Sequence, residues 1–228
     1  MTRESLPCHD VRMSLHVVPQ TFVPETPHMN AAGRSRIHQV PTAHATLMEL
    51  CAPFLPSGQT FDPDCSVVQP EEIPHPDDQL LVHHEHMTIA LQRFHNSPVD
   101  VHVQAEHLSP DGVLYTRKIF LTPRSDPNRP VEWGMVRLDF RYMDDAVRDE
   151  ILRKQMPLGA ILIKHNVHRR IKPRFFVRFP AGGPVLNLFG ASETRPVYGR
   201  LGTIYCDEEP AIELLEIVTG VETNNPSH

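Results

Sequence analysis

The sequence has few cysteines and no long apolar stretch. Its cysteines, Cys8, Cys51, Cys65 and Cys206, are scattered without a Cys-x-x-Cys pair, which argues against a zinc ribbon or a paired redox centre. No apolar run approaches the ~20 residues of a membrane span, and prolines and polar residues occupy the first 30 positions in place of an apolar signal core. We therefore expect free thiols, a cytoplasmic location and no membrane partner.

Signatures of phosphate binding and of serine hydrolysis are also missing. The adjacent glycines Gly182 and Gly183 are not followed by Gly-Lys-Ser/Thr, the pattern that cradles a nucleotide phosphate. The segment GAS at 190–192 lacks the Gly-x-Ser-x-Gly turn that presents a hydrolase serine. The net charge of −6 argues against a general nucleic-acid binder, which needs surplus Lys and Arg. The expected partner is a small molecule and no nucleic acid.

Proline divides the chain unevenly, with 11 of 23 in the first 76 residues. Each proline fixes φ and removes a backbone donor, so residues 1–76 are expected to form a largely irregular or disordered N-terminal extension. Within it we expect a mobile tail to about residue 42 and one short helix at 44–54. The length of 228 residues suits one domain, expected at 77–220, followed by a tail at 221–228.

From residue 77 onward, hydrophobic periodicity predicts alternating helices and strands. A helical pattern covers 77–95, with a break near 86–88. Period-two patterns and turn residues predict further strands and helices. The strands fall at 98–108, 113–121, 133–143, 167–179 and on both sides of a turn at 207–210, and the helices at 144–155, 156–166 and 184–190. The sum is an α+β domain with about six antiparallel strands and helices packed on one face of the sheet.

The segment HHEH at 83–86 is the obvious place to look for metal ligands. Two zinc-binding histidines on a helix are usually four residues apart, as in His-Glu-x-x-His. His83 and His86 are three residues apart, and His84 and Glu85 point in other directions. We expect no metal and no other cofactor here, and histidines that face solvent or a rim.

Two charged residues are predicted to lie in apolar surroundings. Arg117 shares a strand face with Ile119 and Leu121, and Glu216 follows Leu214 and Leu215. A buried charge is unfavourable unless it is paired, so Arg117 either pairs with an inward acid such as Glu216 or binds an anionic ligand. A half-buried glutamate either has a raised pKa that suits acid–base chemistry or is structural. The residues alone leave these alternatives open.

Four segments, in order, resemble the chorismate lyase family: LLVHHEHMTIALQRF, LYTRKIFL, MPLGAILI with HNVHRR after it, and EPAIELLEIV. The resemblance covers about 77–219 and implies the chorismate lyase-like fold, which some transcription regulators use as a ligand-binding domain. By position it implies that Met87 and Leu158 offer backbone amides to the carboxylate of an aromatic product, that Arg117 pairs with this carboxylate, and that Glu216 contacts the ring hydroxyl. Arg169 would meet the enolpyruvyl carboxylate of the substrate.

The resemblance implies a cofactor-free carbon–oxygen lyase that removes pyruvate from chorismate and leaves 4-hydroxybenzoate or a close hydroxybenzoate, with Glu216 and Arg117 catalytic. Chorismate is a dicarboxylate, so two arginine sites suit it, and positioning with electrostatics can lower most of the barrier. The alternative is a non-catalytic sensor of a small aromatic or acidic ligand. The absence of a DNA-binding pattern in 1–76 favours the enzyme.

Glu213 is a second candidate for the acid, because the interval from Pro210 to Glu216 is one residue longer than in the family. The para or meta product and the oligomeric state are left open.

Overall fold

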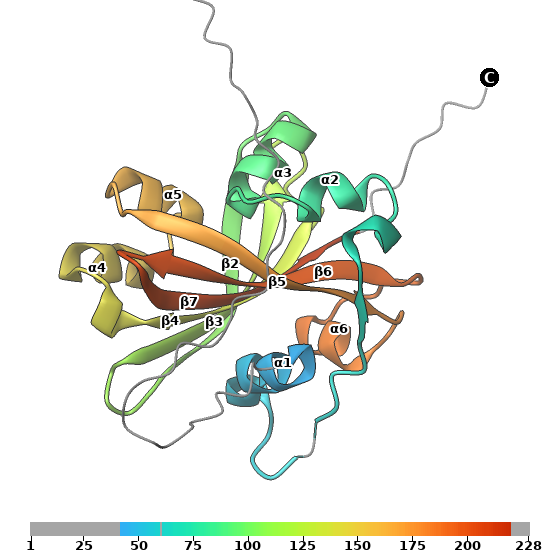
Figure 1. The fold of residues 1–228 in the computed structure, drawn as a ribbon, viewed down its shortest axis with the longest axis horizontal. Coiled ribbons are helices and arrows are strands. Elements are labelled where there is room, and N and C mark those ends of the chain that lie inside the picture. The colour runs from blue at the N-terminus through green and yellow to red at the C-terminus, as the bar shows by residue number, and fades with distance from the viewer. Residues whose placement is uncertain (1–41, 60, 220–228) are drawn as a thin grey trace, which may run out of the picture. The chain divides into compact units, whose positions relative to one another are not determined.

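The computed structural model describes residues 42–59 and 61–219, so the expected tails at 1–41 and 221–228 lie outside the described residues. A seven-stranded antiparallel sheet has the order β1-β5-β6-β7-β4-β3-β2 (Figure 1). The α+β antiparallel architecture predicted from the sequence is confirmed, and β1 is the strand beyond the expected six. The strands are β1 (Ser66–Val68), β2 (Val99–Leu108), β3 (Leu114–Pro123), β4 (Glu132–Asp139), β5 (Arg169–Phe179), β6 (Val197–Cys206) and β7 (Glu209–Val218).

Helices cover both faces of the sheet. They are α1 (Ala43–Cys51), α2 (Asp77–Leu81), α3 (Met87–His95), α4 (Asp145–Arg153), α5 (Leu158–Lys164) and α6 (Pro184–Phe189), with 3-10 turns at Ala52–Phe54, Pro70–Glu72 and Phe140–Tyr142. None of these described helices is long and apolar enough to cross a membrane.

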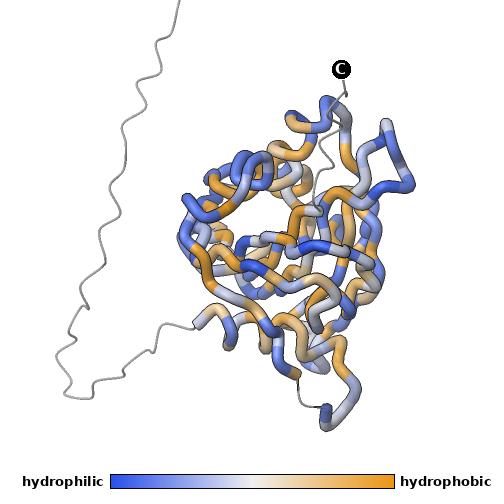
Figure 2. Tube along the Cα trace, turned by 90° about the vertical axis from the view of Figure 1, so that its right-hand side faces the viewer, coloured by the Kyte–Doolittle hydropathy of each residue, from blue (hydrophilic) through white to orange (hydrophobic). Residues whose placement is uncertain are grey.

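Strand side chains alternate between the two faces of the sheet, and both faces carry buried hydrophobic residues. Figure 2 shows hydrophobic and hydrophilic residues interspersed along the Cα trace. On β7, Leu215 and Ile217 pack with α1 and α6, whereas Ile212 and Leu214 pack with α4 and α5. Val218 contributes to a third cluster with α2 and α3. In Figure 1, α1 and α6 lie below the sheet and α2 to α5 above it. The expected single helix layer therefore holds for α2 to α5 only.

Residues before 77 contribute to the same core. In α1, which corresponds to the short helix expected at 44–54, Leu47, Leu50 and Cys51 are fully buried against the sheet. Thr42 begins the helix, because its side-chain oxygen accepts from the N–H of Ala45 at 3.2 Å. Further along, β1 pairs with β5. Residues 42–76 thus supply one helix and one edge strand to the sheet.

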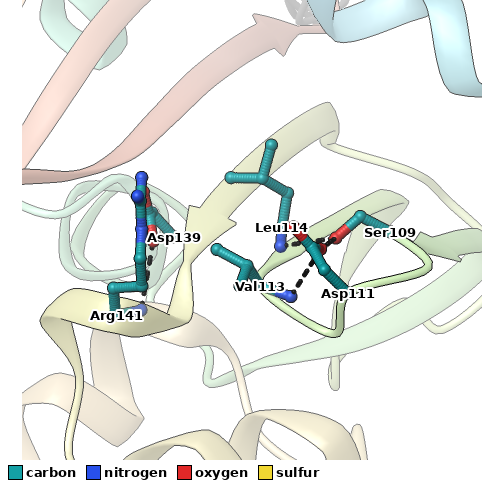
Figure 3. Close-up of polar contacts among 6 residues, drawn as sticks. All are labelled: Ser109, Asp111, Val113, Leu114, Asp139 and Arg141. Atoms are coloured by element: carbon teal, nitrogen blue, oxygen red, sulfur yellow. Dashed lines mark hydrogen bonds and ion pairs between the residues drawn. The ribbon is translucent and has the colours of Figure 1, made fainter.

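The β2–β3 turn fixes the register of the strands that carry Arg117. Ser109 Oγ accepts from the N–H of Leu114 at 2.8 Å, and Asp111 Oδ1 accepts from the N–H of Val113 at 3.1 Å (Figure 3). Such side chain-to-backbone hydrogen bonds are typical of turns that contain Ser, Asp and Gly, as the segment Ser-Pro-Asp-Gly at 109–112 does. The hairpin then places Arg117 beside Val136 of β4, on the face covered by α2 to α5.

The helical pattern at 77–95 forms two helices. Helix α2 ends at Leu81, residues 82–86 are irregular, and α3 starts at Met87. A break was expected at 86–88, but it lies at 82–86, and Met87 and Thr88 are already helical. Its effect is that α3 starts inside the protein, with Met87 and Thr88 buried.

Candidate ligand-binding cavity

A cavity lies between the sheet and the starts of α3 and α5. Its floor comes from β3, β4, β6 and β7, and its walls come from residues 86–88 and 157–159. The lining residues are His86, Met87, Thr88, Arg117, Ile119, Leu121, Glu132, Gly134, Val136, Pro157, Leu158, Gly159, Ile204, Leu214 and Glu216. Most of them are apolar, and the charged groups are few, which is the usual composition of a small-molecule site.

Four of the five site residues predicted from the sequence line this one cavity: Met87, Arg117, Leu158 and Glu216. They come from α3, β3, α5 and β7, which are far apart in the chain. The fifth, Arg169, is not a lining residue. It lies one step behind the wall, where its Nε donates to the Nε2 of His86 at 2.6 Å.

Arg117 is a buried cation without a partner. Its exposed fraction is 0%, and its three guanidinium nitrogens find no hydrogen-bond acceptor among the described residues. Burial lowers the pKa of Arg117, but a guanidinium stays protonated in proteins. Because an unpaired buried charge is strongly unfavourable, this group favours an anion in the cavity.

Glu216 is paired with Arg200 of β6, so the Arg117–Glu216 ion pair considered from the sequence does not form. Arg200 Nε donates to Glu216 Oε2 at 2.5 Å. The other nitrogens of Arg200 donate to the backbone carbonyls of Leu81, His83 and Glu85. Arg200 is 1% exposed. Through these hydrogen bonds it connects the segment 82–86 to Glu216 in the cavity.

Glu213, the second candidate for the site acid, lies on the opposite face of the sheet. Its carboxylate pairs with Arg137 and Arg174, and it is not among the lining residues. A shift of three positions along a strand reverses the face. Of the two acids, Glu216 is the one that meets the cavity.

Glu132 is a second buried acid in the cavity, which the sequence pattern did not reveal. It is 3% exposed, and its Oε2 has no partner in the described part of the chain. Burial raises the pKa of Glu132 well above its usual value; the charge of Glu216 raises it further, and Arg200 opposes the shift. Burial and the charge of Glu216 therefore both favour the protonated form of Glu132.

Two helices begin at the cavity wall. The first N–H groups of a helix have no acceptor within it, and in the described structure no side chain caps α3 or α5. Met87 and Leu158, the first residues of these helices, both line the cavity. Their backbone amides add donors beside the apolar lining, and the start of α3 adds a favourable dipole for an anion.

His86 corrects the expectation that the histidines of 83–86 face solvent or a rim. It is 7% exposed and lines the cavity. Burial, with the charges of Arg169 and Arg200, lowers the pKa of His86 to about 4, so the ring is neutral. Because Arg169 Nε donates to its Nε2, the ring hydrogen is on Nδ1. Across the described residues, no group of three or more His, Cys, Asp or Glu could hold a metal ion.

Gly159 leaves the space that the His86 ring occupies. A Cβ at Gly159 would lie 3.0 Å from the Cβ and Cγ of His86. We expect Gly159→Ala to destabilise the protein by about 1–3 kcal/mol, because the ring is held by Arg169 and cannot move freely. Urea unfolding measures this effect. In a His86→Gly background, which removes the Cβ as well as the ring, the same substitution should have a much smaller effect; equal effects in both backgrounds would contradict the contact.

The charged groups that line the cavity differ in how they are satisfied. Glu216 pairs with Arg200, and burial favours the neutral forms of Glu132 and His86. Arg117 has no hydrogen-bond acceptor among the described residues, although Glu106 on the neighbouring strand β2 attracts it. A ligand with one negative charge would supply the missing acceptor.

Comparisons with known proteins give no family assignment. No family profile and no curated protein matches the chain. Among solved structures, PhnF from Mycobacterium smegmatis is similar with a TM-score of 0.44 and 14% identity over 58% of this chain and 63% of that one, so the chain spans less than two thirds of its length. The effector domain of PhnF from the same organism has a TM-score of 0.39 and 12% identity, over 58% of this chain and 87% of that one. A third similar structure is the ligand-binding domain of a putative GntR-family transcriptional regulator from Bordetella bronchiseptica. Its TM-score is 0.36 and its identity 14%, over 54% of this chain and 83% of that one. These likenesses do not indicate which ligand the cavity takes.

Proposed function

We propose that this domain binds a small aromatic monocarboxylate in the cavity, as a binding or sensor domain and without catalysis. The observation that carries the proposal is Arg117, fully buried and without a partner in the described residues. A carboxylate would take two guanidinium N–H groups at once, and the amides of Met87 and Leu158 lie on the same cavity.

The apolar lining and the single balancing charge favour an aromatic acid with one carboxylate. Ile119, Val136, Ile204 and Leu214 supply apolar contacts. A flat ring fits such a surface better than a branched or strongly hydrated group. A second carboxylate would meet no further unpaired cation among the lining residues.

The second candidate is chorismate lyase activity. The observation that favours it is the meeting of Met87, Arg117, Leu158 and Glu216 in one cavity, since the family resemblance implies these positions for product binding. Two features place it second. Chorismate carries two carboxylates, and Arg169, the position implied for the other carboxylate, is engaged with His86 and with the carbonyl of Val167.

Calorimetry and a pyruvate assay on the full-length protein separate the two candidates. We expect 4-hydroxybenzoate to bind the wild-type protein, and chorismate to release no pyruvate above its spontaneous rate. Enzymatic pyruvate release that is lost in Glu216→Gln would favour the lyase instead. Glu213→Gln is the matched control, because this acid lies on the other face of the sheet. If neither ligand binds and no turnover occurs, the proposed function is wrong.

A further inference from the structure

Arg117 has an acid directly opposite it on the neighbouring strand. Glu106 of β2 is the cross-strand partner of Arg117 on β3. Directly opposite residues of an antiparallel pair lie on one face of the sheet, with Cβ atoms about 4.5–5.5 Å apart, so a glutamate at this position can reach the guanidinium. The charge of Glu106 attracts Arg117. Even so, the guanidinium nitrogens of Arg117 have no hydrogen-bond partner in the described structure.

Two other side chains hold the carboxylate of Glu106. Lys154 Nζ donates to Glu106 Oε1 at 2.5 Å, and Tyr115 Oη donates to Glu106 Oε2 at 2.7 Å. Both carboxylate oxygens therefore have a donor other than Arg117. The same hydrogen bonds, that of Lys154 first, lower the pKa of Glu106, so the acid is ionised near pH 7.

The two donors lie at different depths. Tyr115 is 2% exposed, and its ring stacks on Phe140, which fixes the position of its hydroxyl. Lys154 caps the C-terminal end of α4, and its side chain is 40% exposed. Because an exposed ion pair contributes little to stability, Lys154 can be replaced without loss of the fold. The contact between Lys154 and Glu106 can therefore be tested by itself.

We propose that Glu106 is a positioning residue of the anion site: Tyr115 and Lys154 hold its carboxylate away from Arg117, and this leaves the guanidinium open to the ligand. The inference rests on the proposed monocarboxylate site. A ligand carboxylate needs the N–H groups of Arg117. A glutamate that moved onto those groups would occupy them and would also repel the ligand's charge.

The test is calorimetric titration of the full-length protein with 4-hydroxybenzoate at pH 7. In Lys154→Met the released glutamate competes for Arg117, and we expect the affinity to fall about 3- to 5-fold. Glu106→Gln removes the competing charge and should raise the affinity about 2- to 5-fold. In the double variant no acid is left to release, so its affinity should stay within about twofold of that of Glu106→Gln. Lys154→Arg keeps the charge and should recover most of the affinity that Lys154→Met loses.

The opposite directions of these effects distinguish the proposal from a structural role, because the loss of a structural contact would weaken binding in Glu106→Gln as well. Arg124→Met is the matched control. It releases Asp100, an acid near the other end of β2, and should change the affinity by less than about twofold.

The outcomes separate this inference from the proposed function. If Lys154→Met binds 4-hydroxybenzoate as tightly as the wild-type protein, or if Glu106→Gln binds it more weakly, the inference is wrong although the carboxylate site stands. An equal loss from Lys154→Met with and without Glu106→Gln would also overturn it, because the lysine would then act on the ligand and not through the acid. If the wild-type protein does not bind 4-hydroxybenzoate, the proposed function and this inference are both wrong.

Discussion

Replacing Arg117 with methionine is expected to abolish ligand binding and, at the same time, to stabilise the empty protein. The guanidinium is fully buried and unpaired in the described structure, so the folded state bears its desolvation without compensation. Methionine fills a similar volume without charge. We expect a gain of about 1–4 kcal/mol in the free energy of unfolding, by analogy with buried ion pairs replaced by apolar residues, and at least a ~100-fold loss of affinity for 4-hydroxybenzoate.

Urea unfolding without ligand and calorimetry with ligand measure the two effects separately. Arg124→Met is the control, since this arginine is exposed and pairs only with Asp100 among the described contacts; it should change stability by less than about 0.5 kcal/mol. A loss of stability in Arg117→Met would show that the arginine has a structural partner. Such a result would remove the main support for an anion site.

Local patterns were sufficient for six of the seven strands, apart from their exact ends, and for the inward face of Arg117. The period-two pattern of β3 places Arg117 with Ile119 and Leu121, and all three line the cavity. That prediction needs only the alternation of side chains along one strand. Whether Arg117 has a partner was not predictable in the same way, because the answer depends on which residues of β4, β6 and β7 come beside it.

The pairing of Arg200 with Glu216 could not be predicted from the turn alone. A regular hairpin with a turn at 207–208 pairs position 206 with 209 and would place position 200 beside 215. A register shift between Ile204 and Cys206 moves the pairing by one residue and brings Arg200 beside Glu216. Glu132 was missed because the strand was expected to start at 133. Glu132 shares a strand face with Gly134 and Val136, so β4 starts one residue before the first apolar residue of the pattern, Trp133.

The burial of His86 could not be predicted from its own segment. Residues 83–86 are polar and suggest an exposed stretch, but Gly159 lies against the ring and Arg169 hydrogen-bonds to it. These contacts join positions more than 70 residues apart in the chain. The same holds for Met87 and Leu158, whose meeting in one cavity was implied by the family resemblance and not by any spacing within the sequence.

Replacing Arg200 with methionine is expected to have the opposite effect from Arg117→Met, although both arginines are buried on the same face of the sheet. Arg200 satisfies Glu216 and the carbonyls of the segment that leads into α3. Its removal leaves a buried carboxylate unpaired beside Glu132. We expect a loss of about 3–5 kcal/mol in the free energy of unfolding, measured in urea.

Arg137→Met is the matched control for this loss. Arg137 also pairs with acids on neighbouring elements, but its side chain is 24% exposed. Because water can replace a partly exposed ion pair, we expect Arg137→Met to lower the free energy of unfolding by about 1 kcal/mol or less. Hydrogen exchange at residues 82–88 should accelerate in Arg200→Met and not in Arg137→Met, because only Arg200 binds the carbonyls of that segment. Equal losses of stability in the two variants would show that Arg200 acts as an ordinary ion pair. The contrast between Arg117 and Arg200 follows from their partners. The guanidinium of Arg200 has its acceptors within the described structure, whereas that of Arg117 has no hydrogen-bond acceptor there.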